Sequence, residues 1–261
     1  MRFTNPALAA GMLCMVACAH LPQHAAGPVT PDRPGYTDGA VPLAPGVVQV
    51  EGGVTSDRTA AAAYDSYGEM LVRGGVAPRV ELRLFGNSFG VRRATDGIVS
   101  RGLEDAKVGV KVGLVSRPDS VAGPLPNVAL LLATTVPSGT PGMGAGAAQP
   151  EVKVALSWTT GTPVSVYANS ALARSWDGSA WSTRAAVSVA TWCAVTSRFA
   201  VFGEGISIRS MSGPMPPAAY ADAGATFLLT DQIQVDARFG RGVGRGVSEE
   251  RFVGLGIARR W

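Results

Sequence analysis

The final stretch of the chain, Arg251-Phe-Val-Gly-Leu-Gly-Ile-Ala-Arg-Arg-Trp261, decides the fold. Its residues alternate between two faces, and one of these faces is apolar. An apolar face that ends on an interfacial aromatic residue at the carboxyl terminus is typical of a strand that faces lipid in a transmembrane barrel. We therefore expect a bacterial outer-membrane β-barrel and interpret the apolar face as its assembly signal, formed by Val253, Leu255, Ile257 and Trp261.

The composition favours a β protein over a helical membrane protein. Glycine accounts for 33 of the 261 residues, and Val, Thr and Ser are abundant, as in short strands joined by tight turns. Beyond residue 19, no run approaches the roughly 18 to 20 apolar residues of a spanning helix. The basic residues are scattered among carboxylates, so the formal charge of +4 does not form a nucleic-acid footprint. We expect no nucleic-acid partner.

The first residues resemble a secretory leader. Arg2 precedes an apolar stretch from Ala7 to Ala17, and Ala17-Cys18-Ala19 places small residues where a signal peptidase cleaves. This pattern predicts a cleaved signal peptide over residues 1–19 and export to the bacterial outer membrane. The run Met15-Val16-Ala17-Cys18 also resembles a lipoprotein processing site, so lipidation of Cys18 is an open alternative.

Two regions follow the leader. Residues 20–46 are rich in Pro, Gly and polar side chains and show no alternation, which predicts a periplasmic arm or a plug of the lumen. Residues 47–261 predict an all-β, antiparallel, up-and-down transmembrane barrel of about twelve strands. We place these strands near residues 47–54, 68–75, 79–87, 104–115, 127–136, 151–158, 163–172, 180–192, 197–208, 219–229, 232–240 and 251–261.

Alternation alone also fits a soluble β-sandwich, and the links between strands favour the barrel. With both termini in the periplasm, the links of a barrel alternate between long extracellular loops and short periplasmic turns. The long links here are Thr55–Tyr67, Ser88–Leu103, Pro137–Pro150, Ser175–Ser179, Arg209–Ala218 and Arg241–Glu250. The short ones are Val76–Pro78, Thr159–Thr162, Cys193–Thr196 and Thr230–Asp231, and Ser116–Pro126 is longer than this pattern predicts.

Several motifs resemble one family of outer-membrane proteins. They are Asp32–Gly39, Glu69–Gly75 running into Arg79–Leu84, Gly102–Lys111, Val136–Gly139, Pro150–Trp158 and Thr230–Asp236. Over residues 32–261, and in this order, they resemble the family of the MetA pathway of phenol degradation. The resemblance implies a transporter-like barrel associated with the uptake of aromatic compounds. The chain departs from the family at Arg259, where an apolar or aromatic residue is usual, and at Trp261, which replaces a terminal Phe.

The face opposite the apolar one carries charges of both signs. We expect these side chains to line the lumen, either as a solute pathway or as cross-strand salt bridges that stabilise a narrow barrel. The set is Glu51, Glu69, Arg73, Glu81, Arg83, Asp105, Lys107, Lys111, Glu151, Lys153, Glu204, Asp222, Asp236, Arg238 and Arg260. Phe85, Tyr167 and Tyr220 add inward aromatic contacts. Within the preceding segment, Asp32, Arg33 and Asp38 are the residues that we expect to pair with the wall as a plug.

The sequence does not contain a recognisable catalytic or metal-binding site. The lipases and proteases among outer-membrane barrels rely on a histidine base, and both histidines, His20 and His24, precede the first strand. A His cluster or Cys cluster that would hold a metal is also lacking. We predict that the protein is not an enzyme and uses neither a metal nor a cofactor.

The sequence therefore favours an outer-membrane channel or transporter for small solutes, including hydrophobic or aromatic ones, that pass passively through the barrel. The alternative function is a structural or adhesive barrel with a closed, salt-bridged lumen. The expected partners are outer-membrane lipid and lipopolysaccharide, the barrel assembly machinery and a small-molecule solute.

Overall fold

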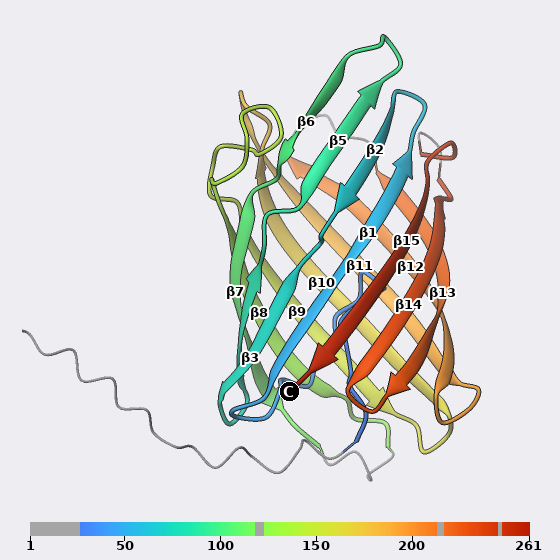
Figure 1. Cartoon of the computed structure of the whole chain (residues 1–261). Helices are drawn as coiled ribbons and strands as arrows, with labels where there is room; N and C mark the ends of the chain where they lie inside the picture. Colours follow the sequence, from blue (N-terminus) through green and yellow to red (C-terminus); the bar gives the residue numbers. More distant parts are fainter. Residues whose placement is uncertain (1–26, 118–122, 213–216, 245–246) are drawn as a thin grey trace, which may run out of the picture.

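The computed structural model describes residues 27–117, 123–212, 217–244 and 247–261. Within these ranges, antiparallel strands β1 to β15 form one continuous sheet. Twelve of them close into a barrel, because the last strand pairs with the first (Figure 1). The predicted all-β barrel of about twelve strands is confirmed, and closure of the sheet on itself excludes the sandwich. The described part of the chain has no helix long and apolar enough to span a membrane.

The barrel strands follow one another around the wall in sequence order. Their bounds are β1 Val48–Arg58, β3 Leu71–Ala77, β4 Val80–Phe85, β7 Ala106–Val115, β8 Asn127–Val136, β9 Pro150–Thr159, β10 Val164–Trp176, β11 Trp181–Ala194, β12 Phe199–Ser212, β13 Ala218–Thr230, β14 Ile233–Gly242 and β15 Arg251–Arg260. Short turns join β3 to β4 and β13 to β14 at one end of the barrel, and the link from β8 to β9 at the other end is long. Because short turns are periplasmic, both Val48 and Trp261 lie at the periplasmic end.

The sheet continues beyond the barrel at the extracellular end, where the sequence predicts only links. The outer part of β1 pairs with β2 (Ala62–Tyr67), β2 pairs with β5 (Phe89–Ala94), and β5 pairs with β6 (Val99–Leu103). The prediction of plain loops over Thr55–Tyr67 and Ser88–Leu103 is therefore wrong. These strands are only 5 or 6 residues long. They are held by pairing to a barrel strand, so their own sequences show little apolar alternation.

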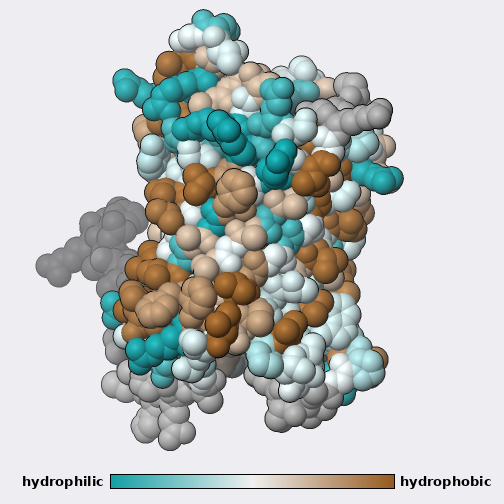
Figure 2. Space-filling view, turned by 90° about the vertical axis from the view of Figure 1, so that its right-hand side faces the viewer, coloured by the Kyte–Doolittle hydropathy of each residue, from teal (hydrophilic) through white to brown (hydrophobic). Residues whose placement is uncertain are grey.

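The two faces of the wall differ in exposure as the sequence predicts. On β4, the side chains of Leu82 and Leu84 are about half exposed, whereas Glu81 and Arg83 are buried inside the barrel. The lipid-facing residues of β15 show the same pattern, and Val253 is 51% exposed. Figure 2 shows hydrophobic surface over the middle and lower parts of one side of the barrel and hydrophilic side chains gathered towards the top.

Residues 27–46 lie inside the barrel rather than beside it (Figure 1). They form no regular strand. The segment enters at the periplasmic end, where the Val29 amide donates to the Asp231 carbonyl at 2.7 Å. Further in, Ala40 packs in a buried apolar cluster with Ala129, Leu131 and Ala155 of β8 and β9. Because small residues line the wall there, the segment contacts it directly. The predicted signal peptide over residues 1–19 and the alternative lipidation of Cys18 lie outside the described residues.

Candidate functional site in the lumen

Asp32 of the N-terminal segment lies among three cations of the barrel wall. Its Oδ2 atom accepts hydrogen bonds from Lys111 Nζ at 2.8 Å and from Arg83 Nη1, and Arg73 Nη1 lies 3.6 Å away. The three cations come from the adjacent strands β7, β4 and β3. Alternation with period two points all three into the lumen. The other carboxylate oxygen of Asp32 accepts the Gly39 amide at 3.0 Å, which folds the segment into a loop around this carboxylate.

Asp38 is the second carboxylate that the segment brings to the wall. It accepts hydrogen bonds from Arg83 Nη2 at 3.0 Å and from Lys153 Nζ at 2.5 Å. Its backbone is held as well, because its amide donates to Asn169 Oδ1 at 2.7 Å and its carbonyl accepts from Asn169 Nδ2 at 3.0 Å. Asp38 is thus fixed to β4, β9 and β10 together.

Arg73 joins the wall carboxylates into the same network. Its guanidinium binds Glu81 through two parallel hydrogen bonds of 2.8 and 2.9 Å and reaches Glu51 at 3.0 Å. Both carboxylates also accept from the segment: Glu51 from the Asp32 amide at 3.1 Å, and Glu81 from the Leu43 amide at 2.9 Å. Bidentate Arg–carboxylate pairs fix geometry more strongly than single bonds, so these side chains form a rigid docking surface.

Glu204 of β12 holds the segment from the opposite side of the barrel. Its carboxylate accepts the amides of Tyr36 at 2.7 Å and Thr37 at 2.6 Å, together with the Thr37 hydroxyl. The Thr37 hydroxyl also lies 2.7 Å from the Ser188 hydroxyl of β11. Because its contacts run from β3 to β12, the segment crosses the lumen.

The charges of this network balance only when the segment is present. The wall contributes the buried cations Arg73, Arg83, Lys111 and Lys153 and the buried carboxylates Glu51 and Glu81. Asp32 and Asp38 of the segment supply the two missing negative charges. Lys111 is completely buried, and an uncompensated buried cation is very costly. The wall on this side of the barrel is therefore stable only around a docked segment or around water.

Arg33, a basic residue of the segment, contacts strands β14 and β15. Its guanidinium pairs with Glu69 at 2.8 Å, lies 3.9 Å from Asp236 and donates to the Leu255 carbonyl at 3.3 Å. Close packing explains two glycines nearby, since a Cβ atom on Gly53 or Gly256 would meet the Arg33 side chain within 2.5 Å.

The remaining predicted lumen residues lie outside this network or at its edge. Lys107 and Glu151 pair at 2.9 Å and are partly exposed. Asp105 accepts the amides of Ser138, Gly139 and Ala145 and thereby organises the β8–β9 loop rather than the lumen. The carboxylates of Asp222 and Asp236 accept no hydrogen bond from a described residue. Arg238 reaches Thr55 at 3.4 Å, and Arg260 donates to the Pro28 carbonyl at 3.1 Å.

Neutral polar residues that sequence reasoning missed complete the docking surface. Ser157 Oγ accepts the Ala40 amide at 2.8 Å, and Asn169 and Ser188 bind the segment as described above. Gln49 donates to Glu51 at 2.9 Å and to the Thr30 carbonyl at 3.3 Å. Each occupies an inward position of a predicted strand, so alternation could have identified them if neutral side chains had been considered together with charged ones.

An aromatic pair lines the lumen away from the charged network. Trp192 of β11 and Phe202 of β12 face each other across the strands with ring centroids 4.6 Å apart and stack at 21°. The Phe202 ring lies over Gly224, where a Cβ atom would meet it at 2.4 Å. The predicted inward aromatics occupy inward positions as well, and Phe85 lies 5.4 Å from Lys107 Nζ, measured to the ring centroid. Phe202 is buried and Trp192 is half-buried, so of this pair only the Trp192 ring offers aromatic surface to the lumen.

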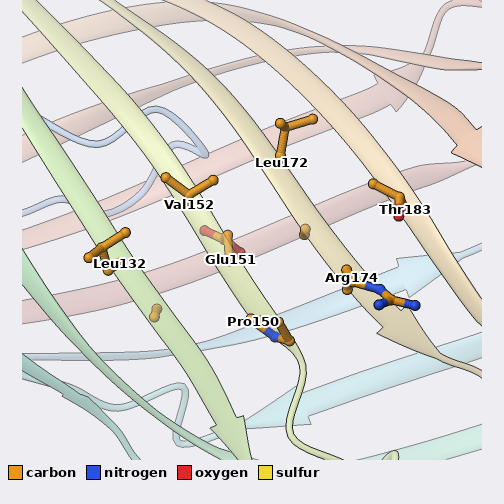
Figure 3. A pocket seen from close by; sticks show the side chains of 9 residues that line it. Leu132, Pro150, Glu151, Val152, Leu172, Arg174 and Thr183 are labelled. Carbon is orange, nitrogen blue, oxygen red and sulfur yellow. The ribbon is translucent and has the colours of Figure 1, made fainter.

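A hollow of about 370 Å³ lies against the wall near the extracellular ends of β8 to β11 (Figure 3). Leu132, Val152 and Leu172 are exposed on the outside of the barrel, while Glu151 lies behind the ribbon in this view. Arg174 lies at the edge of the hollow, with its guanidinium 4.9 Å from the Trp181 ring centroid. Because its exposed apolar residues face lipid, the hollow is not part of the lumen. No group of His, Cys, Asp and Glu among the described residues is arranged to hold a metal ion.

Comparison with known proteins establishes the family. Residues 31–261 match the family model described as "Putative MetA-pathway of phenol degradation". The chain belongs to this family. The resemblance predicted from the motifs is therefore confirmed over almost the whole described chain. A comparison with curated protein sequences gave no significant match.

Several solved structures with the same fold are outer-membrane channels and porins. A crystal structure of an outer membrane channel from Pseudomonas putida F1 matches with a TM-score of 0.68 and 13% identity, covering 89% of this chain and 100% of that one. The NanC porin matches with a TM-score of 0.55 and 12% identity, covering 81% and 98%. The KdgM porin in complex with disordered oligogalacturonate matches with a TM-score of 0.53 and 9% identity, covering 81% and 98%. The chain therefore has the fold of an outer-membrane β-barrel.

Proposed function

We propose that the protein is an outer-membrane channel through which small solutes, including hydrophobic and aromatic ones, pass passively. The observation that carries this proposal is the distribution of side chains on the barrel wall, which is apolar on the outside and polar or charged on the inside. A barrel with a polar interior is suited to hold water and solutes. The family description and the shared fold with a Pseudomonas putida F1 channel support the same function.

We propose that residues 27–46, within the predicted arm or plug of residues 20–46, regulate passage. The segment crosses the lumen and is bound on several sides, so solutes must pass beside it or displace it. Displacement must break the bonds to Asp32, Asp38 and Glu204 together with the other bonds of the segment to the wall. We also propose that residues 1–19 direct export and that the barrel assembly machinery inserts the protein.

We propose that the preference for aromatic solutes arises from Trp192, whose half-buried ring stacks on the buried ring of Phe202. Offset and edge contacts between aromatic rings add about 0.5–1.5 kcal/mol beyond area burial. A phenol-like solute would gain this contact, and a sugar of similar size would not. The KdgM porin structure contains oligogalacturonate, but the likeness of this chain to that porin extends to the fold alone.

The test combines planar-bilayer conductance with liposome swelling, using the full chain and its Asp32→Asn/Asp38→Asn double variant. We expect the double variant to show a higher mean conductance, because the wall cations lose their charged partners. Asp96→Asn, in the exposed turn between β5 and β6, is the matched control and should leave conductance unchanged. Equal conductance after deletion of residues 28–40 would refute the regulatory role of the segment.

Liposome swelling tests the solute class. Trp192→Ala should slow the entry of phenol several-fold relative to a sugar, whereas Trp181→Ala, on the outer face, should leave this ratio unchanged. If Trp192→Ala leaves the ratio of phenol entry to sugar entry unchanged, Trp192 does not give the channel a preference for aromatic solutes.

The buried ion network also favours a second function, a structural or adhesive barrel with a closed lumen. The buried cations and carboxylates of the wall, Glu204 included, knit Asp32, Asp38 and the backbone of the segment to the wall, which stabilises a barrel whether or not solutes pass. The absence of conductance in both the native protein and the deletion variant, with normal assembly, would favour this function over the channel.

A further inference from the structure

Three arginines lie side by side on the outer face of the barrel near its extracellular end. In the register of the sheet, Arg58 of β1 is opposite Arg251 of β15, and Arg251 is opposite Arg241 of β14. All three face outward, because they share the alternation of exposed residues such as Val253 and Phe239. Directly opposite side chains have Cβ atoms about 5 Å apart, and like charges in such positions repel. This row therefore favours an anionic partner.

Described carboxylates neutralise only one side of the row. Arg58 pairs with Asp65 at 2.9 Å, but Asp65 is shared with Arg93, which approaches to 2.5 Å. Arg241 reaches two backbone carbonyls, of Gly242 and Ser248, at 3.4 Å.

The middle arginine has no counterion among the described residues. Arg251 is exposed, and its guanidinium forms neither an ion pair nor a hydrogen bond with a described residue. Of the two carboxylates in the preceding turn, Glu250 accepts the Tyr220 hydroxyl at 2.7 Å, and Glu249 forms no ion pair with a described residue. The positive charge centred on Arg251 is thus left for a partner outside the protein.

Apolar surface begins immediately below the row. Two residues nearer the middle of the barrel, Phe239 is opposite Val253, and these side chains are 59% and 51% exposed. Leu255 continues this surface at 56% exposure. Two residues span roughly 7 Å along a strand, so the arginines lie where the headgroups of a lipid would meet a barrel that contacts its acyl chains.

We propose that Arg251, with Arg58 and Arg241 on either side, is a binding site for the phosphate groups of an anionic glycolipid of the outer leaflet. Its acyl chains would lie on Phe239, Val253 and Leu255. Guanidinium groups bind phosphate through two parallel hydrogen bonds, which suits a row of arginines. The leaflet is the outer one because the row lies at the end with long loops. The hollow on the outside of β8 to β11 does not offer such a row of arginines. It has one arginine, Arg174, and the guanidinium of Arg174 already lies over the Trp181 ring. The site does not depend on channel function.

The test measures binding of diphosphorylated lipid A to the purified full-length protein by native mass spectrometry. Arg251→Gln should weaken binding about tenfold, which corresponds to about 1.4 kcal/mol. Arg259→Gln is the matched control on the same strand, because Arg259 also faces outward but lies at the periplasmic end. We expect lipid A without phosphates to bind the native protein and Arg251→Gln equally weakly.

The proposal fails if Arg251→Gln binds diphosphorylated lipid A as the native protein does, or if Arg259→Gln weakens binding as much. It also fails if removal of the phosphates leaves the affinity unchanged. Heat-modifiable gel mobility reports assembly of each variant. If Arg251→Gln does not assemble, Arg241→Gln and Arg58→Gln provide the same comparison. Arg251→Lys keeps the charge but loses the two parallel hydrogen bonds, so it should retain only part of the binding.

Discussion

Lys111 of β7 donates a hydrogen bond to Asp32 of the N-terminal segment at 2.8 Å, although the two residues are 79 positions apart in the chain. Lys111 is completely buried, and its ammonium group would otherwise have to be hydrated inside the wall. This contact therefore links the position of the segment to the stability of the barrel.

Replacing Asp32 with Asn should destabilise the protein by about 3–5 kcal/mol, the range for breaking a buried ion pair. The reason is that Lys111 and Arg83 lose a charged partner that they share. Denaturant unfolding in detergent, followed by heat-modifiable mobility, measures this change. A double-mutant cycle with Lys111→Met separates the pair from its surroundings. If Asp32→Asn is as destabilising with Met at position 111 as with Lys, the contact does not contribute in the way we infer.

Gly75 of β3 should not tolerate a side chain. A Cβ atom there would lie 2.0 Å from the carbonyl oxygen of Ala44, which is backbone and cannot move aside without shifting the segment. We expect Gly75→Ala to cost about 1–3 kcal/mol, as overpacking does, and to increase chymotryptic cleavage after Tyr36 of the segment. Gly74→Ala is the control, because a Cβ atom on Gly74 meets nothing within 4 Å. Equal cleavage in both variants would mean that the segment is not held by this contact.

Sequence reasoning predicted the barrel strands well because lipid and lumen impose opposite demands on alternate residues. Val80 to Phe85 shows this clearly, with its leucines outside and Glu81 and Arg83 inside. The same reasoning selected Lys111 and Asp32, which the structure brings together, but it also selected Asp105, which organises the β8–β9 loop.

The extension formed by β2, β5 and β6 could not be predicted in this way, because both of its faces lie outside the lipid. Alternation weakens where no apolar medium selects one face. The partners of Asp32 and Asp38 were equally inaccessible, since the path of an irregular segment is fixed by bonds to residues far away in the chain. Asn169 and Glu204 hold its backbone amides, and nothing in the sequence of the segment specifies these partners.

Asp65 of β2 should titrate unusually low for an aspartate. The hydrogen bond from the Ser56 hydroxyl lowers the pKa of Asp65 most, and burial of the carboxyl raises it by a smaller amount. Hydrogen bonds from Arg58 and Arg93 lower it further, so the pKa falls from its ordinary 3.8 to about 2. A lowered pKa in the folded state contributes stability that is present above pH 3.8 and is lost as the pH falls through about 2. We therefore expect the extracellular extension to loosen only below pH 4.

An NMR titration of the Asp65 carboxyl carbon in detergent micelles measures this pKa. Ser56→Ala should raise it towards 3.8, because the hydrogen bond that lowers this pKa most is lost. Ser100→Ala on β6 should leave it in place. An unperturbed Asp65 pKa in the native protein would contradict the ion-pair geometry around this carboxylate.

Trp261 should matter more for assembly than Arg259 does. The Trp261 amide donates to the Val48 carbonyl at 2.9 Å, and the Val48 amide donates to the Trp261 carbonyl at 3.3 Å, so these two bonds complete the seam between β1 and β15. The Arg259 guanidinium lies 4.6 Å from the Trp261 ring centroid, which places its charge on an aromatic face at the interface. Deleting Trp261 removes both backbone bonds and the ring, at about 2 kcal/mol for the bonds alone, whereas Arg259→Tyr removes one contact and puts an aromatic residue in its place. The fraction of protein with heat-modifiable mobility after folding into lipid should therefore fall much further for the deletion than for Arg259→Tyr. If the truncated chain assembles as well as the native one, the terminal aromatic residue acts as ordinary strand surface and closure of the barrel depends on the other pairs between β1 and β15.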